Sequence, residues 1–153
     1  MRWLVINEVE ALQLLSSIQG ATAGADDMDI PCAWSISNPI LKPYFRTLFR
    51  LSRLSLFNTI NIVCTIGPHG VVAFIPGLSA STNADEPIYI PAAILRGEVR
   101  DTTGAGDCFT GYLAAGLLES DDGDRMRKED YIAILQRCVH VSDFYECDTI
   151  LAN

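Results

Sequence analysis

The chain has 153 residues, of which 49% are hydrophobic and 20% are charged, and its net charge at pH 7 is −8. This length and composition are sufficient for a domain with a buried core, and they exclude an intrinsically disordered protein. The negative charge argues against nucleic acid or an anionic membrane as a main partner, because both repel an acidic surface.

The five cysteines are scattered along the sequence without a Cys-x-x-Cys pair, and only two histidines are present. This pattern gives little support to a zinc site and is typical of reduced thiols in a cytoplasmic protein. The longest apolar runs are far below the about 18–20 residues that a membrane-spanning helix needs. Residues 1–6 are too short for the apolar core of a signal peptide. We therefore expect a cytoplasmic protein without a membrane partner.

Strand and helix patterns alternate in the first part of the chain. Residues 3–6 predict a short buried strand, and residues 8–18 have the apolar spacing of a helix that Gly20 would end. The acidic loop that follows lacks the spacing of a calcium loop. Residues 38–57 predict a long helix, on which a basic stripe marks the solvent-facing side. The stripe consists of Arg46, Arg50 and Arg53.

The second part of the chain begins with a hairpin. Residues 60–66 and 71–75 predict two strands around a tight turn, and shorter strands are expected near 88–90 and 98–100. Helices are predicted over 108–118 and over 128–144. The apolar stripe of the last helix consists of Tyr131, Ile134, Leu135, Cys138 and Val139. This order of elements favours an α/β fold with a mostly parallel sheet.

Residues 101–107, Asp-Thr-Thr-Gly-Ala-Gly-Asp, join two carboxylates through a turn of small residues. Small residues let backbone N–H groups face outward, and the helix that follows adds its positive N-terminal end. Asp107 falls in the first turn of that helix, where a carboxylate beside a bound phosphate can act as the base of a phosphoryl transfer. A short Gly-x-Gly-Asp pattern alone is usually only a loop or a helix cap.

The complete string, followed by Cys-Phe-Thr-Gly, resembles the C-terminal signature of the ribokinase-like (PfkB) family of sugar and nucleoside kinases. The resemblance implies a Rossmann-type α/β fold, in which a three-layer, mostly parallel sheet is flanked by helices. It makes Asp107 the catalytic base, and it makes the backbone N–H groups of Gly104, Ala105 and Gly106 an anion hole.

Asp101 matches a residue of the family that contributes to a monovalent-cation site. Residues 145–153 do not resemble the loop that completes this site in the family. Two roles are therefore open for Asp101, that of a potassium ligand and that of a cap that shapes the turn.

The segment Asn7-Glu8-Val9-Glu10 is similar to the Asn-x-x-Glu motif of the same family. The resemblance implies that Asn7 and Glu10 organise Mg²⁺ and the transferred phosphates, with Glu10 acting mainly through water. An ordinary helix N-terminus would also explain this pattern.

Residues 65–70, Thr-Ile-Gly-Pro-His-Gly, are similar to the Thr-x-Gly-x-x-Gly strand and turn of the family. The resemblance makes Thr65 and Gly67 contacts of ATP, and Gly70 a residue that shapes the backbone. A hairpin turn alone would also account for the two glycines.

The resemblance extends from about residue 5 to about residue 118, and more loosely to residue 144. It corresponds to the C-terminal half of a family member, so residues 1–153 are expected to form one domain that is truncated on the N-terminal side. The parts of the family without a counterpart are the lid and the sugar-binding half. A halved sheet would expose a strand edge or an apolar face, which makes a homo-oligomer an open expectation.

The implied reaction is the ATP-dependent phosphorylation of the primary hydroxyl of a sugar, ribose to ribose 5-phosphate, with Mg²⁺ as cofactor. Two alternatives stay open. One is a non-catalytic, nucleotide-binding fragment, and the other is a kinase for a nucleoside or another sugar, because the selective residues belong to the absent half. A Rossmann dehydrogenase and a P-loop protein are disfavoured, because neither glycine motif occurs in the sequence.

Overall fold

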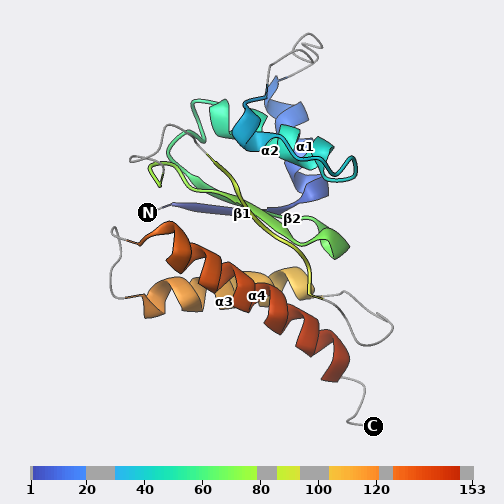
Figure 1. Ribbon diagram of the computed structural model, residues 1–153, viewed down its shortest axis with the longest axis vertical. Helices are drawn as coiled ribbons and strands as arrows, with labels where there is room; N and C mark the ends of the chain where they lie inside the picture. The colour runs from blue at the N-terminus through green and yellow to red at the C-terminus, as the bar shows by residue number, and fades with distance from the viewer. Residues whose placement is uncertain (1, 20–29, 79–85, 94–103, 121–125, 149–153) are drawn as a thin grey trace. The chain divides into compact units, whose positions relative to one another are not determined.

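A computed structural model describes residues 2–19, 30–78, 86–93, 104–120 and 126–148 (Figure 1). The chain divides into two compact units, Met1–Tyr89 and Ile90–Asn153. The strand expected near 98–100 and the residue Asp101 lie outside the described residues. Among the described helices, none combines the length and the apolar character that crossing a membrane requires.

Four strands form one sheet in the order β1-β2-β3-β4. Their bounds are Trp3–Asn7 for β1, Asn61–Thr65 for β2, Val71–Phe74 for β3 and Ile88–Ile90 for β4. β1 runs parallel to β2, whereas β2 and β3 are antiparallel and form the predicted hairpin. β2 and β3 are buried along almost their whole length, which explains their continuous apolar sequences. The sheet is therefore mixed, and the predicted strands within the described residues are confirmed.

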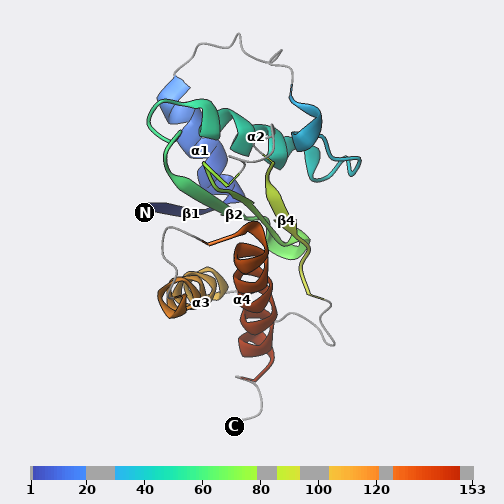
Figure 2. The ribbon, with the colours of Figure 1, turned by 60° about the vertical axis from the view of Figure 1, so that its left-hand side comes forward.

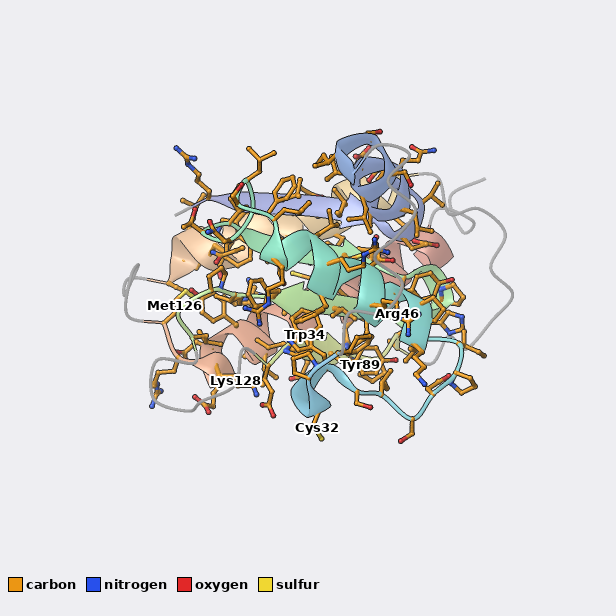
Figure 3. The ribbon with its side chains drawn as sticks, turned by 90° about the horizontal axis from the view of Figure 1, so that it is seen from above. Cys32, Trp34, Arg46, Tyr89, Met126 and Lys128 are labelled. Atoms are coloured by element: carbon orange, nitrogen blue, oxygen red, sulfur yellow. The ribbon has the colours of Figure 1, made fainter. Side chains whose placement is uncertain are left out.

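Two helices of the first unit, α1 (Glu8–Gln19) and α2 (Lys42–Arg53), lie side by side on one face of the sheet (Figures 1 and 2). Trp34, on the short 3-10 turn η1 (Cys32–Trp34), fills the space between this layer and the strands (Figure 3). Its ring centroid is 5.3 Å from that of Phe49 on α2 and 5.5 Å from that of Phe74 on β3. The core of this unit is thus an aromatic and aliphatic layer between α2 and the sheet.

α2 is shorter than the helix predicted over 38–57. Asn38 precedes a proline, and it forms a turn in which its side-chain Oδ1 accepts from the N–H of Ile40 at 2.9 Å. At the other end the chain leaves the helix at Leu54, whose ψ of 137° is extended. The solvent-facing stripe is confirmed for Arg46 and Arg53, which are exposed, while Arg50 is half-buried.

The second unit contains α3 (Ala105–Glu119) and α4 (Lys128–Asp148), which pack against each other (Figure 2). The predicted apolar stripe of α4 is buried at Tyr131, Leu135, Cys138 and Val139. An ion pair of 2.8 Å joins Arg137 of α4 to Glu119 of α3. The two helices pack closely at Gly116, where an added Cβ would lie 2.9 Å from Cγ2 of Ile134.

This close approach predicts that Gly116→Ala destabilises the second unit. A methyl group at 2.9 Å from Ile134 forces a shift in the packing of α3 on α4. Gly111→Ala is the matched control, because Gly111 lies on the same helix with nothing within 4 Å of its added Cβ. We expect Gly116→Ala to be less stable than Gly111→Ala by about 1 kcal/mol or more in urea unfolding. Equal stability of the two variants would contradict the described helix packing.

Candidate functional site

The carboxyl ends of β1 and β2 meet at one corner of the first unit. Asn7 and Thr65 are the last residues of these two strands, and they lie opposite each other in the parallel pair. α1 begins at Glu8, immediately after β1, so that its N-terminus lies at the same corner. In α/β sheets, ligands bind outside the carboxyl ends of parallel strands, and helix N-termini there favour anions.

The Asn-x-x-Glu segment forms a reciprocal cap at the start of α1. Oδ1 of Asn7 accepts hydrogen bonds from the N–H groups of Val9 at 3.0 Å and of Glu10 at 2.9 Å. In return, the N–H of Asn7 donates to Oε2 of Glu10 at 2.9 Å. This is the arrangement of a capping box, with Asn7 at the N-cap and Glu10 at the third helical position. The segment therefore has a structural function in α1, and its role toward a metal stays a prediction.

The fit of Mg²⁺ to this corner depends on the oxygen atoms that Glu8 and Glu10 present. Among the described residues, no three His, Cys, Asp or Glu side chains are grouped closely enough to hold a metal ion. Mg²⁺ commonly keeps several waters and is held by one or two carboxylates together with phosphates of the substrate. Glu10 is exposed and uses only Oε2 in the cap, so that its charge faces solvent. The residues present fit a water-mediated magnesium site and do not form a protein cage.

The turn between β2 and β3 lies at the same corner. The N–H of Ile66 donates to the carbonyl of Gly70 at 2.7 Å, and the N–H of Gly70 donates to the carbonyl of Gly67 at 3.2 Å. Gly70 has a φ of 98°, which explains why a glycine is needed at the end of the turn. An added Cβ at Gly67 would lie 3.6 Å from Oε1 of Glu8, so the turn approaches the first turn of α1.

The structure thus brings Asn7, Glu10, Thr65, Gly67 and Gly70 together in the first unit, although they come from two distant segments. Two neighbours of this corner, Glu8 and Tyr89, are not among the residues predicted from the sequence. Glu8 could have been noted from its place inside the Asn-x-x-Glu motif. Tyr89 carries no local sequence signal, because its hydrogen bond to the turn joins residues 20 positions apart.

Cys64, next to Thr65 on β2, has a pKa that is raised to about 12 by burial first, and then by the negative charges of Glu8 and Glu10. Because the folded state holds this thiol protonated, its contribution to stability is complete below pH 9 and is lost as the pH rises toward 12. We expect Cys64→Ala to reduce the fall in the free energy of unfolding between pH 8.5 and 10.5, measured by urea unfolding. Cys32→Ala, at an exposed thiol, is the control. If the free energy of unfolding fell equally steeply in Cys64→Ala and in wild type, the Cys64 thiol would not be the source of this pH dependence.

The second unit holds the other predicted residues at the start of α3. Gly104 occupies the N-cap position with a φ of 89° and a ψ of −6°, a left-handed conformation that favours glycine. Its carbonyl accepts the first helical hydrogen bond from the N–H of Cys108 at 2.9 Å. Asp107 lies in the first helical turn, as predicted, and its side chain is exposed.

The opening of α3 has the features of an anion site. The first N–H groups of an α-helix have no partner within the helix, and Gly104 offers no side chain to cap them. Among the described residues that are not chain neighbours, no atom lies within 4 Å of an added Cβ at Gly104 or Gly106. The arrangement therefore combines the start of a helix, whose end is positive, with one exposed carboxylate, that of Asp107.

A family model described as pfkB family carbohydrate kinase matches residues 55–139, which is more than half of the chain. The chain belongs to this family. The match covers β2, the turn 67–70, β3, β4 and α3, and it includes Asp107. The members of this family are enzymes, the carbohydrate kinases. No curated protein matches the chain.

Solved structures give the fold of this pfkB chain. It is similar to ribokinase from Cryptococcus neoformans var. grubii serotype A in complex with ADP, with a TM-score of 0.64 and 27% identity over 94% of this chain and 38% of that one. It is similar to ribokinase from Giardia lamblia, with a TM-score of 0.58 and 20% identity over 94% of this chain and 36% of that one. It is also similar to Anopheles gambiae adenosine kinase in complex with P1,P4-di(adenosine-5) tetraphosphate, with a TM-score of 0.56 and 19% identity over 94% of this chain and 33% of that one.

These likenesses confirm the ribokinase-like α/β fold, to which the mixed sheet and its helices correspond. The pfkB chain spans 33–38% of the length of these three structures.

Proposed function

We propose that the chain carries the nucleotide-binding and catalytic part of an ATP-dependent phosphotransferase that acts on the primary hydroxyl of a sugar, with ribose as substrate and ribose 5-phosphate as product. The observation that carries the proposal is the start of α3 in a pfkB-family chain. There Asp107 stands exposed in the first turn, beside helix N–H groups that Gly104 leaves uncapped. We further propose that residues 1–153 correspond to the C-terminal half of such a kinase.

In the proposed reaction, Asp107 takes the proton of the primary hydroxyl as its oxygen attacks the γ-phosphorus of ATP. The new bond joins this oxygen to phosphorus, while the bond between the γ-phosphorus and the β,γ-bridging oxygen breaks and ADP leaves. The backbone N–H groups of Gly104, Ala105 and Gly106 stabilise the negative charge that develops on the phosphoryl oxygens. Asp107 is suited to the role of base because it is exposed and lies in the same helical turn as these amides.

For the nucleotide, we propose contacts with Thr65 and Gly67, with Gly70 shaping the turn. The similar ribokinase was solved with ADP, which supports an adenine nucleotide here. When bound, Mg²⁺ would neutralise charge on the phosphate oxygens. Asn7 and Glu10 would orient its waters, since both lie at the corner where Thr65 ends β2. For Asp101, a potassium ligand and a cap of the turn both remain proposals.

A second candidate function is nucleotide binding without turnover. This candidate is favoured because the chain spans only 38% of the length of the similar ribokinase. Phosphoryl transfer depends on positioning and on exclusion of water, which a lid and a sugar pocket would provide. A nucleoside is the third candidate substrate class, and the likeness to an adenosine kinase is compatible with it.

Transfer of the γ-phosphate separates these candidates. The folded chain is incubated with γ-labelled ATP and Mg²⁺, and with ribose, adenosine or no acceptor, and the labelled products are separated. Slow labelling of ribose above the no-acceptor level supports the sugar kinase, and labelling of adenosine alone supports the nucleoside kinase. ATP binding with no labelled acceptor supports the non-catalytic candidate.

We also propose a cytoplasmic protein that self-associates. The four cysteines whose side chains are described are all free thiols. β1 lies at one end of the described strand order, and Val9 and Leu12 on the adjacent α1 are 55% and 47% exposed. An open strand edge beside apolar side chains favours association with a second copy.

A further inference from the structure

One side-chain hydrogen bond reaches the turn 67–70 from a distant part of the sequence. The hydroxyl of Tyr89, on β4, donates to the main-chain carbonyl of His69 at 2.8 Å. This carbonyl belongs to the peptide group between His69 and Gly70. The bond therefore acts on the backbone of the turn, and it is independent of the identity of the side chain at position 69.

The peptide group that Tyr89 holds is the one that closes the turn. Its other end is the N–H of Gly70, which donates to the carbonyl of Gly67 at 3.2 Å, and the carbonyl of Gly70 accepts from Ile66 at 2.7 Å. Glycine adopts positive and negative φ with similar ease, so the peptide before Gly70 can rotate at low cost unless it is held. A rotation would break the bond to Gly67 and would redirect the backbone next to Thr65.

Tyr89 is itself fixed on two sides. Its neighbours on β4, Ile88 and Ile90, are both buried. Its ring makes an edge contact with Phe45 of α2, with centroids 5.8 Å apart and planes at 63°. The hydroxyl is thus presented to the turn by a packed ring, so little side-chain entropy is lost in forming the bond.

Burial also raises the pKa of the Tyr89 phenol. The group consequently stays protonated, and remains a donor, over the whole range in which the protein would be assayed. A donor is what the His69 carbonyl requires, because a carbonyl oxygen only accepts.

We propose that Tyr89 is a positioning residue of the nucleotide turn, holding the peptide between His69 and Gly70 so that Gly67 and Thr65 keep the backbone geometry that receives ATP. This inference rests on the proposed nucleotide role of residues 65–70. Tyr89 acts through the turn and does not itself contact the nucleotide.

The test compares Tyr89→Phe with Tyr44→Phe in the full chain. Tyr89→Phe removes only the hydroxyl and retains the ring that packs on Phe45. Tyr44→Phe removes a hydroxyl from a half-buried tyrosine on α2 of the same unit. Affinity for Mg-ATP is measured by calorimetry, and exchange of the Gly70 N–H with solvent is followed by NMR. Thermal unfolding shows whether the variants keep the wild-type fold.

We expect Tyr89→Phe to bind Mg-ATP about 2- to 10-fold more weakly, the effect of one lost hydrogen bond. Exchange of the Gly70 N–H is expected to accelerate in the same variant, whereas Tyr44→Phe matches wild type in both measurements. A purely structural role of Tyr89 would lower the melting temperature without changing Gly70 exchange in the folded state.

The outcomes separate the inference from the proposed function. If wild type binds Mg-ATP and Tyr89→Phe binds it equally well, the inference is overturned and the nucleotide site stands. Unchanged Gly70 exchange in Tyr89→Phe overturns the inference as well, whatever the affinity. If folded wild type binds no Mg-ATP, the proposed nucleotide site fails, and the role of Tyr89 in nucleotide binding fails with it.

Discussion

Replacing Asp107 with asparagine is expected to lower the rate of phosphoryl transfer from ATP to ribose by about 10²- to 10⁴-fold, the usual contribution of a general base. The amide of asparagine has nearly the same size as the carboxylate, but it cannot take the proton of the attacking hydroxyl. Because the chain alone is expected to turn over slowly, the measurement is a single-turnover assay with γ-labelled ATP and enzyme in excess. Affinity for Mg-ATP should change little, because the role proposed for Asp107 is toward the hydroxyl of the acceptor.

Glu129→Gln is the matched control for this variant. Glu129 lies in the first turn of α4, in the same unit as Asp107, and its side chain is also exposed. The substitution removes one negative charge near a helix N-terminus without touching α3. We expect the transfer rate of Glu129→Gln to equal that of wild type. If Asp107→Asn retained the wild-type rate, Asp107 would not be the base, whereas equal losses in both variants would indicate a general effect of charge.

Replacing Glu10 with glutamine is expected to raise the Mg²⁺ concentration needed for half-maximal ATP binding by about 10- to 100-fold, as loss of a group that orients metal-bound water usually does. The side-chain oxygen of glutamine can still accept from the N–H of Asn7, so the capping box is kept. The negative charge that is proposed to attract Mg²⁺ and its waters is removed. A titration of Mg²⁺ at fixed ATP, followed by calorimetry, measures the shift.

Two further variants separate the cap from the metal role. Glu10→Ala removes the charge and the bond to Asn7 together, so it should lose stability in urea unfolding in addition to the shift in Mg²⁺ requirement. Glu129→Gln again controls for a lower net charge and should leave the Mg²⁺ requirement unchanged. If Glu10→Gln needs no more Mg²⁺ for ATP binding than wild type does, and Glu10→Ala is less stable, then Glu10 acts only in the cap.

The regular elements of this protein could be predicted because their signals are local. The apolar run of β2 and the spacing of Tyr131, Leu135 and Cys138 on α4 depend on residues that are neighbours in the sequence. The predicted boundaries were less accurate where a turn interrupts a longer pattern. At Asn38, a side-chain hydrogen bond to the backbone competes with the helix, so that α2 begins only at Lys42.

The candidate site could also be predicted where its signals are local in the sequence. The place of Asp107 in the first turn of α3 follows from the small residues before it, as the sequence indicated. Asn7 and Glu10 show the limit of a local pattern, because a capping box and a metal-orienting pair require the same two side chains. The bond from Tyr89 to His69 could not be predicted, since it depends on how β4 is placed beside the turn.

Binding of Mg-ATP to the folded 153-residue chain is the most direct test of the proposed nucleotide site. Calorimetry at millimolar ATP, with the fold verified by circular dichroism, should show weak but saturable binding that requires Mg²⁺ and that Glu10→Gln weakens. No heat of binding from a folded sample at these concentrations would contradict both the kinase and the nucleotide-binding candidates.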